Sequence, residues 1–262
     1  MSLVNHLEQF MSKGKYYFTT VELKQSLKIN QSSLSVSLSR LAKKGRLKMI
    51  RRGFGVIYPT LFNEPHPSFY IDGMMNYLGV KYYVALLSAA AYWGASHQSN
   101  MSYQIVVDKF MTDISFKKSR IEFITKKGSF PKYGITRIAG VGGYYNISTS
   151  ELTAFDLIRF PKRSGHLNNI ATILSELSEK WDGRKIQALC HDPFVPAVTL
   201  QRLGYLLDFL GLQKESKYFE RALSNRNSAT LFLSNSEKGM KRVPQKLNKR
   251  WNLYINTIVE PD

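Results

Sequence analysis

The chain has 262 residues, of which 44% are hydrophobic and 21% charged, a composition typical of a folded protein with one large or two ordinary domains. Its formal net charge of +18 favours a polyanionic partner, most often nucleic acid and less often an anionic membrane. No apolar run approaches the roughly 18–20 residues of a membrane span, and the beginning of the sequence lacks the apolar core of a signal peptide. The single cysteine, Cys190, excludes an internal disulfide, so we expect a cytoplasmic protein without membrane contact.

The positive charge is concentrated at one end of the sequence. Residues 1–62 carry eleven lysine and arginine residues against two acidic residues, an excess of nine. The remaining 200 residues carry the same excess, so half of the net charge lies in less than a quarter of the chain. This unevenness argues against a generic solubilising surface and makes the first 62 residues the expected nucleic-acid-binding part.

The first 62 residues follow the element order of a winged helix-turn-helix domain. Apolar spacing and candidate caps predict helices at 2–13, from Thr19 or Thr20 to Leu27, and from Ser32 or Ser33 to Lys44, with a short strand at 16–18. Gly45 is expected just after the third helix. Two apolar runs at 47–50 and 56–59, separated by "RRGFG", predict a tight hairpin, which would be the wing.

The third predicted helix carries the side chains expected to contact DNA. Leu34, Leu38 and Leu41 are spaced to pack inward. In a winged helix this element enters the major groove, where glutamine and arginine bind base edges and basic residues meet phosphates. The residues expected to read or approach bases are Gln31, Ser32, Ser33, Ser35, Ser37 and Arg40, and those expected to bind phosphate are Lys43, Lys44, Arg46 and, on the wing, Arg51 and Arg52. A solvated basic helical hairpin and a protein-binding winged helix are the alternatives.

The rest of the chain is predicted to form a larger mixed α/β domain, which makes the fold class α+β. Prolines in the stretch 59–67 mark a linker at 63–74, followed by the domain at 75–262. The apolar run at 75–95 predicts one buried helical stretch ended by Gly94. Strands are expected at 103–107, 121–124, within 133–149, at 229–234 and within 250–260; helices are expected within 148–160, 167–181, 183–191, 197–211 and 215–224.

Several other patterns favour ordinary structural roles. The five histidines form no metal-ligand pair, so no metal or cofactor is expected. The stretch "DGRK" at 182–185 matches a nuclease motif at only two positions, and the glycines at 140–143 fit a turn better than a phosphate loop. The stretch 94–100 is interpreted as a loop that ends a helix; otherwise its Ser96, His97 and Gln98 would belong to a functional or interdomain surface.

Two basic runs in the larger domain have two interpretations. Solvated faces are the default, and the alternative is an extended phosphate-binding track or a surface for RNA or an acidic partner. The first run contains Lys117, Lys118, Arg120, Lys126, Lys127 and Lys132, and the second contains Lys238, Lys241, Arg242, Lys246, Lys249 and Arg250.

Four phrases, in this order, carry a family resemblance: "YYVALLSAAAYWGASHQ", "ISTSELTAFDLIRF", "QRLGYLLDFLG" and "RWNLYINTIVEPD". Together they resemble the AbiEi-type antitoxins of bacterial type IV toxin–antitoxin systems, over nearly the whole chain. The resemblance implies that the winged helix represses transcription by binding inverted repeats in double-stranded DNA upstream of its own operon. The implied contacts lie between Ser32 and Lys44 and at Arg51 and Arg52. The larger domain would counter a nucleotidyltransferase-like toxin without a stable complex, and no catalytic residue is implied.

Three other functions stay open on the sequence alone. The protein could be a stand-alone DNA-binding regulator, or an interaction module whose basic second domain binds protein or RNA. It could also be a nucleic-acid-processing enzyme that docks its substrate on the winged helix. The acids available to such an enzyme, whose spacing forms no known motif, are Asp108, Asp113, Asp156 and Asp182.

Overall fold

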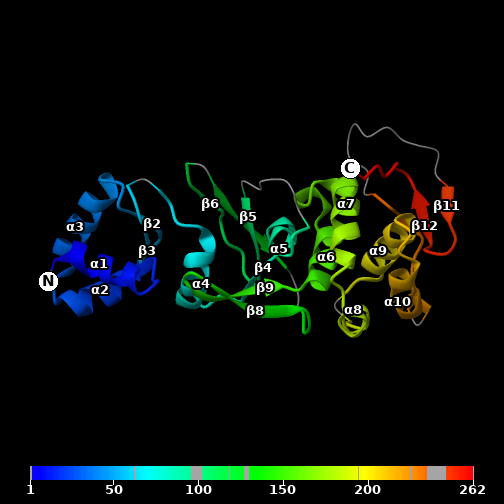
Figure 1. Cartoon of the computed structure of the whole chain (residues 1–262), viewed down its shortest axis with the longest axis horizontal. Coiled ribbons are helices and arrows are strands. Elements are labelled where there is room, and N and C mark those ends of the chain that lie inside the picture. The colour runs from blue at the N-terminus through cyan, green and yellow to red at the C-terminus, as the bar shows by residue number, and fades with distance from the viewer. Residues whose placement is uncertain are drawn as a thin grey trace.

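The computed structural model describes residues 2–61, 63–95, 102–117, 119–126, 130–193, 195–224, 226–234 and 246–261. Figure 1 shows three parts that follow one another along the long axis. They are the N-terminal helices with their hairpin, a central sheet, and a layer of helices that ends in a small sheet. The expected α+β fold, beginning with a winged helix-turn-helix, is confirmed.

The N-terminal part contains three helices and a three-stranded sheet in the predicted order. Its elements are α1 (Leu3–Ser12), β1 (Tyr17–Thr19), α2 (Thr20–Leu27), α3 (Gln31–Lys43), β2 (Leu47–Arg51) and β3 (Phe54–Ile57). The Thr19 hydroxyl caps α2, and Gly45 follows α3 at φ +66°. The prediction that Ser32 or Ser33 caps α3 is wrong. Asn30 caps this helix instead, because its side chain accepts a hydrogen bond from the Ser33 amide at 2.8 Å.

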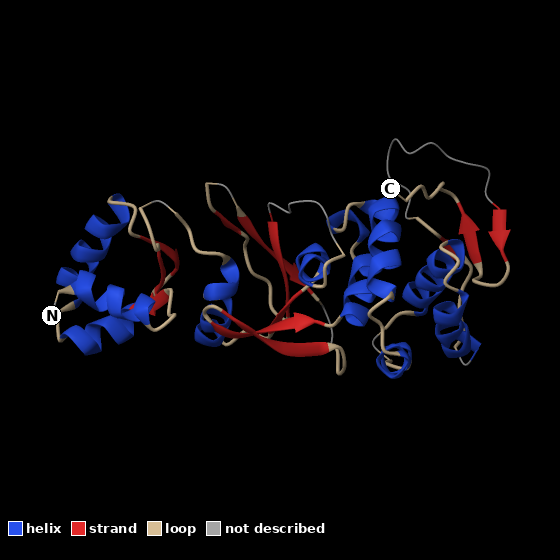
Figure 2. Cartoon of the chain, in the orientation of Figure 1, coloured by secondary structure: helices blue, strands red, loops and turns tan. Residues whose placement is uncertain are grey.

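The small N-terminal sheet, in the strand order β1-β3-β2, packs on both of its faces. On one face Ile57 belongs to the same apolar cluster as Leu34 of α3. On the other face Phe54 and Val56 belong to the cluster that contains Met74 of the central part. Successive residues of a strand point to opposite faces, so β3 contributes to two cores. Figure 2 shows the resulting arrangement, with the N-terminal helices at the outer end and the strands turned toward the rest of the molecule.

The proline-containing segment expected to link the domains is itself packed. It forms a short 3-10 helix (Pro67–Phe69) and the first turn of α4 (Ile71–Leu78). Pro67, Tyr70 and Met74 are buried, and the last two lie in the cluster that holds the hairpin residues Phe54 and Val56. The division at residues 62 and 74 stays a prediction, and apolar packing joins the chain on both sides of it.

The expectation of one helical stretch over 75–95 is wrong. The chain forms α4, then β4 (Tyr82–Val84), then α5 (Leu86–Tyr92). Gly79, at φ +61°, ends α4 in the left-handed conformation. The strand that follows is buried on both faces, and a short run that is wholly apolar has no period by which a strand can be told from a buried helix.

The central sheet has six strands in the order β6-β7-β5-β4-β9-β8. The strands not yet named are β5 (Ser102–Val107), β6 (Ile114–Ser115), β7 (Arg120–Thr125), β8 (Ile135–Gly140) and β9 (Gly143–Ser148). The predicted strands at 103–107 and 121–124 pair in parallel as β5 and β7, and the glycines at 140–143 form the turn of the β8–β9 hairpin. One face packs on α4 and the N-terminal hairpin, and the other packs on the helical layer.

The helices expected after residue 148 are confirmed. They are α6 (Ser150–Arg159), α7 (His166–Ser178), α8 (Gly183–Cys190), α9 (Ala197–Phe209) and α10 (Gln213–Ser224), with a 3-10 turn at Pro161–Arg163. Asp182, the acid of "DGRK", caps α8 by accepting a hydrogen bond from the Arg184 amide at 2.8 Å. The chain ends in a small sheet of β10 (Leu231–Phe232), β12 (Leu253–Ile255) and β11 (Lys246–Asn248), in that order.

Candidate nucleic-acid interface

One face of α3 is open to solvent at the outer end of the molecule (Figure 1). The opposite face holds the helix through Leu34 and Leu38, which are buried against the other N-terminal helices and the hairpin. At 3.6 residues per turn, the side chains furthest from these leucines form one row. The members of this row, all exposed, are Ser32, Ser33, Val36, Ser39, Arg40 and Lys43.

The row contains two residues that sequence reasoning missed, Val36 and Ser39. Val36 lies near the centre of the row and is 50% exposed, although valine is apolar. The sequence interpretation missed Val36 because it selected only polar residues. A helical-wheel projection centred on Leu34 and Leu38 would have placed Val36 on the opposite, exposed face. Of the residues expected to approach bases, Ser37 is only half-exposed because it lies beside the buried face.

The basic residues at the end of α3 lie where the sequence placed them. Lys43 is in the last turn of the helix, Lys44 is its C-cap, and Arg46 follows Gly45. All three side chains are exposed. They extend the exposed row of α3 with positive charge, which fits contacts to a phosphate backbone.

Arg51 does not match the expectation of a phosphate-binding wing residue. Its guanidinium donates hydrogen bonds to the carbonyl oxygens of Ile50 and Thr112 and lies over the Phe123 ring, 5.5 Å from the ring centroid. Burial lowers the pKa of Arg51, and the charge of Asp113 opposes this shift. The side chain is therefore used in the contact between the hairpin and the central sheet.

Two further contacts hold the hairpin on the central part. Lys48 donates to the Ser115 carbonyl at 2.7 Å and lies over the Phe116 ring. At the tip of the hairpin, the Tyr77 hydroxyl of α4 donates to the Arg52 carbonyl at 3.1 Å. The hairpin backbone is thus fixed, while the Arg52 side chain points to solvent and stays available as a phosphate contact.

Of the members of the two basic runs that the structure describes, one is buried, two form ion pairs at the surface, and the others are exposed. The surface role considered for Lys126 is wrong, because this residue is only 6% exposed and pairs with Asp156. Arg120 pairs with Asp113, and Arg250 pairs with Asp208 at 2.7 Å and Glu220 at 2.8 Å. The exposed members include Lys117, Lys246 and Lys249. Five members of the runs lie outside the described residues: Lys118, Lys127, Lys238, Lys241 and Arg242. The loop residues Ser96, His97 and Gln98 also lie outside them.

The four acids considered for catalysis each have a separate structural partner. Asp108 accepts a hydrogen bond from the Lys81 amide, Asp113 accepts from the Phe123 amide, and Asp182 caps α8. Asp156 is buried with Tyr83 and Lys126. Within the described ranges, no group of three or more acidic, histidine or cysteine side chains is arranged to hold a metal ion.

Comparisons with known proteins match the N-terminal part and a stretch from the central sheet into the helical layer. Residues 6–54 match the family model "Transcriptional regulator, AbiEi antitoxin", and residues 83–209 match the model "AbiEi antitoxin C-terminal domain". The chain belongs to the AbiEi antitoxin family. In this AbiEi antitoxin the first match includes all of α3, and the second runs from β4 to the end of α9. The predicted resemblance to AbiEi antitoxins and transcriptional regulators is confirmed.

A solved structure supports the fold of this AbiEi antitoxin. The crystal structure of the RV2827C protein from Mycobacterium tuberculosis superposes with a TM-score of 0.70 and 13% sequence identity, covering 95% of this chain and 89% of that chain. At this identity the likeness concerns the fold alone. No curated protein matches the chain by sequence. Among the described residues, no helix combines the length and apolar character needed to cross a membrane.

Proposed function

We propose that the winged helix-turn-helix of this AbiEi antitoxin binds operator DNA through the exposed row of α3. The chemistry of that row carries the proposal. Ser32 and Ser33 are short and allow close approach to the major groove, and Arg40 can donate two hydrogen bonds to a guanine edge. Val36 can pack against a thymine methyl group. The basic residues that follow would contact phosphates and give the sequence-independent part of the affinity.

The ligand in this proposal is double-stranded DNA with inverted repeats upstream of the protein's own operon, and binding represses transcription. We propose further that residues 75–262 counteract a nucleotidyltransferase-like toxin of a type IV system without an enzymatic step and without a stable complex. The family match at residues 83–209 supports an antitoxin role for this part. The separate internal partners of Asp108, Asp113, Asp156 and Asp182 favour a non-enzymatic protein over a nuclease.

Replacing Arg40 by alanine is expected to weaken binding of the upstream DNA by about ten- to a hundredfold, since a bidentate contact to guanine contributes about 1–3 kcal/mol of discrimination. Binding to unrelated DNA should fall much less. Fluorescence anisotropy with labelled upstream DNA, in the presence and absence of unlabelled competitor, measures both affinities. The variant should still protect cells against the toxin, because Arg40 lies in the N-terminal part.

Arg221→Ala is the matched control for Arg40→Ala. Arg221 is also an exposed arginine on a helix, but it lies on α10 in the helical layer. Its removal changes the net charge equally and should leave both affinities unchanged. Equal losses with the two variants would show that only total charge matters, and the proposed role of α3 would be abandoned.

Arg52→Gln and Arg51→Gln should have different effects, although the two residues are adjacent. Arg52→Gln should reduce the slope of log affinity against log salt by about 1 and weaken binding to all sequences, because one phosphate contact is lost. Arg51→Gln should leave that slope unchanged and lower the free energy of unfolding by about 1–3 kcal/mol, since it removes hydrogen bonds to Ile50 and Thr112. A slope reduced equally by Arg51→Gln would place Arg51 on DNA and contradict its structural role.

A further inference from the structure

An exposed valine lies in the middle of the row of α3 that faces solvent. Val36 is 50% exposed and, among the described residues, belongs to none of the three apolar clusters of the molecule. The hydrophobic effect favours covering such a side chain, and the other members of the row are exposed as well. The apolar surface of Val36 is therefore available to whatever α3 binds.

The serines beside Val36 in the row discriminate little between bases. Ser32 and Ser33 lie about one turn before it, and Ser39 lies three positions after it. A serine hydroxyl can donate or accept a hydrogen bond, so it accommodates either kind of base edge. The Ser32 hydroxyl also donates to Asn30 Oδ1 at 2.8 Å, within the N-cap of the helix. The serines therefore leave base discrimination to the other members of the row.

Val36 and Arg40 present two unlike groups to the major groove. In that groove thymine carries a C5-methyl group, which apolar side chains contact, whereas guanine carries two acceptors, N7 and O6, which a guanidinium binds. The two residues are four positions apart, so they lie on one face of α3, about 6 Å apart along the helix axis. Successive bases of a DNA strand are about 3.4 Å apart along the duplex, so this distance spans about two base pairs.

The N-terminal hairpin is held too firmly to add a second reading element. The Gly53 carbonyl accepts a hydrogen bond from the Thr20 amide at 2.9 Å, and the Arg52 carbonyl accepts one from the Tyr77 hydroxyl at 3.1 Å. Arg52 is the exposed residue of the turn, and its neighbours Arg51 and Gly53 are half-buried. A tip fixed in this way places one cation against a phosphate and does not extend along a minor groove.

We propose that α3 recognises a thymine and a guanine about two base pairs apart in each operator repeat, and that it does so through the major groove alone. Val36 contacts the thymine methyl group, and Arg40 contacts guanine N7 and O6. The inference rests on the proposed binding of operator DNA by α3, and it adds the chemical groups that the helix distinguishes. Val36 is thus a specificity residue, and uracil is a poorer ligand than thymine although the two bases pair alike.

Base analogues in a duplex of one protected repeat test each contact by itself. Deoxyuridine in place of one thymine removes only the methyl group, and 7-deazaguanine in place of one guanine removes the N7 acceptor. Fluorescence anisotropy at fixed salt should show one deoxyuridine position at which the full-length protein binds about fourfold more weakly, the effect of one methyl group. A 7-deazaguanine position about two base pairs away should weaken binding by about tenfold. Inosine in place of guanine removes only a minor-groove amino group and should leave the affinity unchanged.

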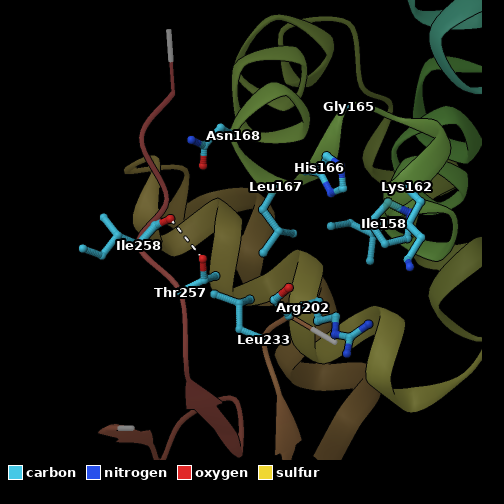
Figure 3. A pocket seen from close by; sticks show the side chains of 12 residues that line it. Ile158, Lys162, Gly165, His166, Leu167, Asn168, Arg202, Leu233, Thr257 and Ile258 are labelled. Carbon is cyan, nitrogen blue, oxygen red and sulfur yellow. Dashed lines mark hydrogen bonds between the residues drawn. The ribbon is translucent and has the colours of Figure 1, made fainter. Parts of the chain in front are cut away.

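Variants assign each effect to its side chain. Val36→Ala should bind the thymine and deoxyuridine duplexes equally, and Arg40→Ala should bind the guanine and 7-deazaguanine duplexes equally, because the contact is already lost. Val21→Ala is the matched control, since Val21 is an exposed valine on α2 of the same part. Ile258→Ala is a remote control, because Ile258 is an exposed apolar residue beside a pocket of the helical layer (Figure 3). Both controls should keep the full sensitivity to deoxyuridine.

The outcomes separate this inference from operator binding itself. Protection of discrete repeats without any methyl-sensitive thymine, or a deoxyuridine effect that Val36→Ala retains, would overturn the inference and leave operator binding standing. A methyl-sensitive thymine and an N7-sensitive guanine more than about three base pairs apart would overturn the spacing. Weaker binding of the inosine duplexes would overturn reading through the major groove alone. If the protein protects no discrete repeat, the proposed function fails, and this inference fails with it.

Discussion

Lys126→Met is expected to lower the free energy of unfolding by about 3–5 kcal/mol, because it leaves a buried carboxylate without its cation. Lys126 is 6% exposed and Asp156 is 1% exposed. The Lys126 ammonium lies 3.3 Å from Asp156 Oδ1, and the Tyr83 hydroxyl donates to Asp156 Oδ2 at 2.7 Å. Burial and the neighbouring Asp156 raise the pKa of Tyr83, so this hydroxyl remains a neutral donor. The three residues join the central sheet to α6 across the interior.

Urea unfolding of two further variants distinguishes the effect of breaking the Lys126–Asp156 pair from the effect of losing any lysine. Lys185→Met makes the same chemical change at an exposed position on α8 and should alter stability by less than about 0.5 kcal/mol. The double variant Lys126→Met/Asp156→Leu should recover most of the loss, because it removes both charges. A Lys126→Met variant as stable as Lys185→Met would show that Asp156 needs no cation at this place.

Phe54→Ala is expected to lower the free energy of unfolding by about 3–5 kcal/mol, and to do so for the N-terminal and central parts together. Phe54 is fully buried, stacks on Tyr17 at 5.2 Å and contacts Tyr77 of α4 at 5.6 Å, measured between ring centroids. Its cluster also contains Met74 and residues of the central sheet. Removing its ring therefore opens a cavity in a core that both parts share.

Tryptophan fluorescence makes this prediction decisive. All three tryptophans, Trp93, Trp181 and Trp251, lie outside the N-terminal part, so their signal reports the unfolding of the rest of the chain. Phe54→Ala should shift this transition to lower urea, whereas Val36→Ala, at an exposed site in the same N-terminal part, should leave it in place. An unchanged tryptophan transition in Phe54→Ala would show that the two parts unfold independently. Deleting residues 1–62 would remove Phe54 and Val56 from the core shared with Met74 and expose that core. DNA binding by the N-terminal part is therefore better tested with point variants of the full chain.

Local patterns predicted most of the elements. The three N-terminal helices, the hairpin and the helices from α6 onward are amphipathic or turn-bounded segments whose period is visible in the sequence. The β8–β9 hairpin was predicted from its glycines. The prediction of one helix over 75–95 is wrong because this segment contains β4, which lies at the centre of the sheet. Both faces of β4 are apolar there, so the alternation that identifies a strand is missing.

The functional residues were less predictable because their roles depend on distant partners. Arg51 and Lys126 look like surface cations in the sequence, yet their partners Thr112 and Asp156 lie far along the chain and are brought close only by packing. Val36 was missed for the opposite reason, since apolar residues on a helix are usually assigned to the core. The buried positions of Leu34 and Leu38 in the structure define the opposite face of α3, and Val36 and Ser39 are then seen to belong to its exposed row.

A footprint of the full-length protein on the DNA upstream of its own gene, at physiological salt with competitor DNA, tests operator binding by α3 most directly. We predict protection of discrete repeats, lost in Arg40→Ala and retained in Arg221→Ala. Uniform weak protection along the fragment, or discrete protection that Arg40→Ala and a second variant of the row, Val36→Ala, both retain, would contradict operator reading by this helix.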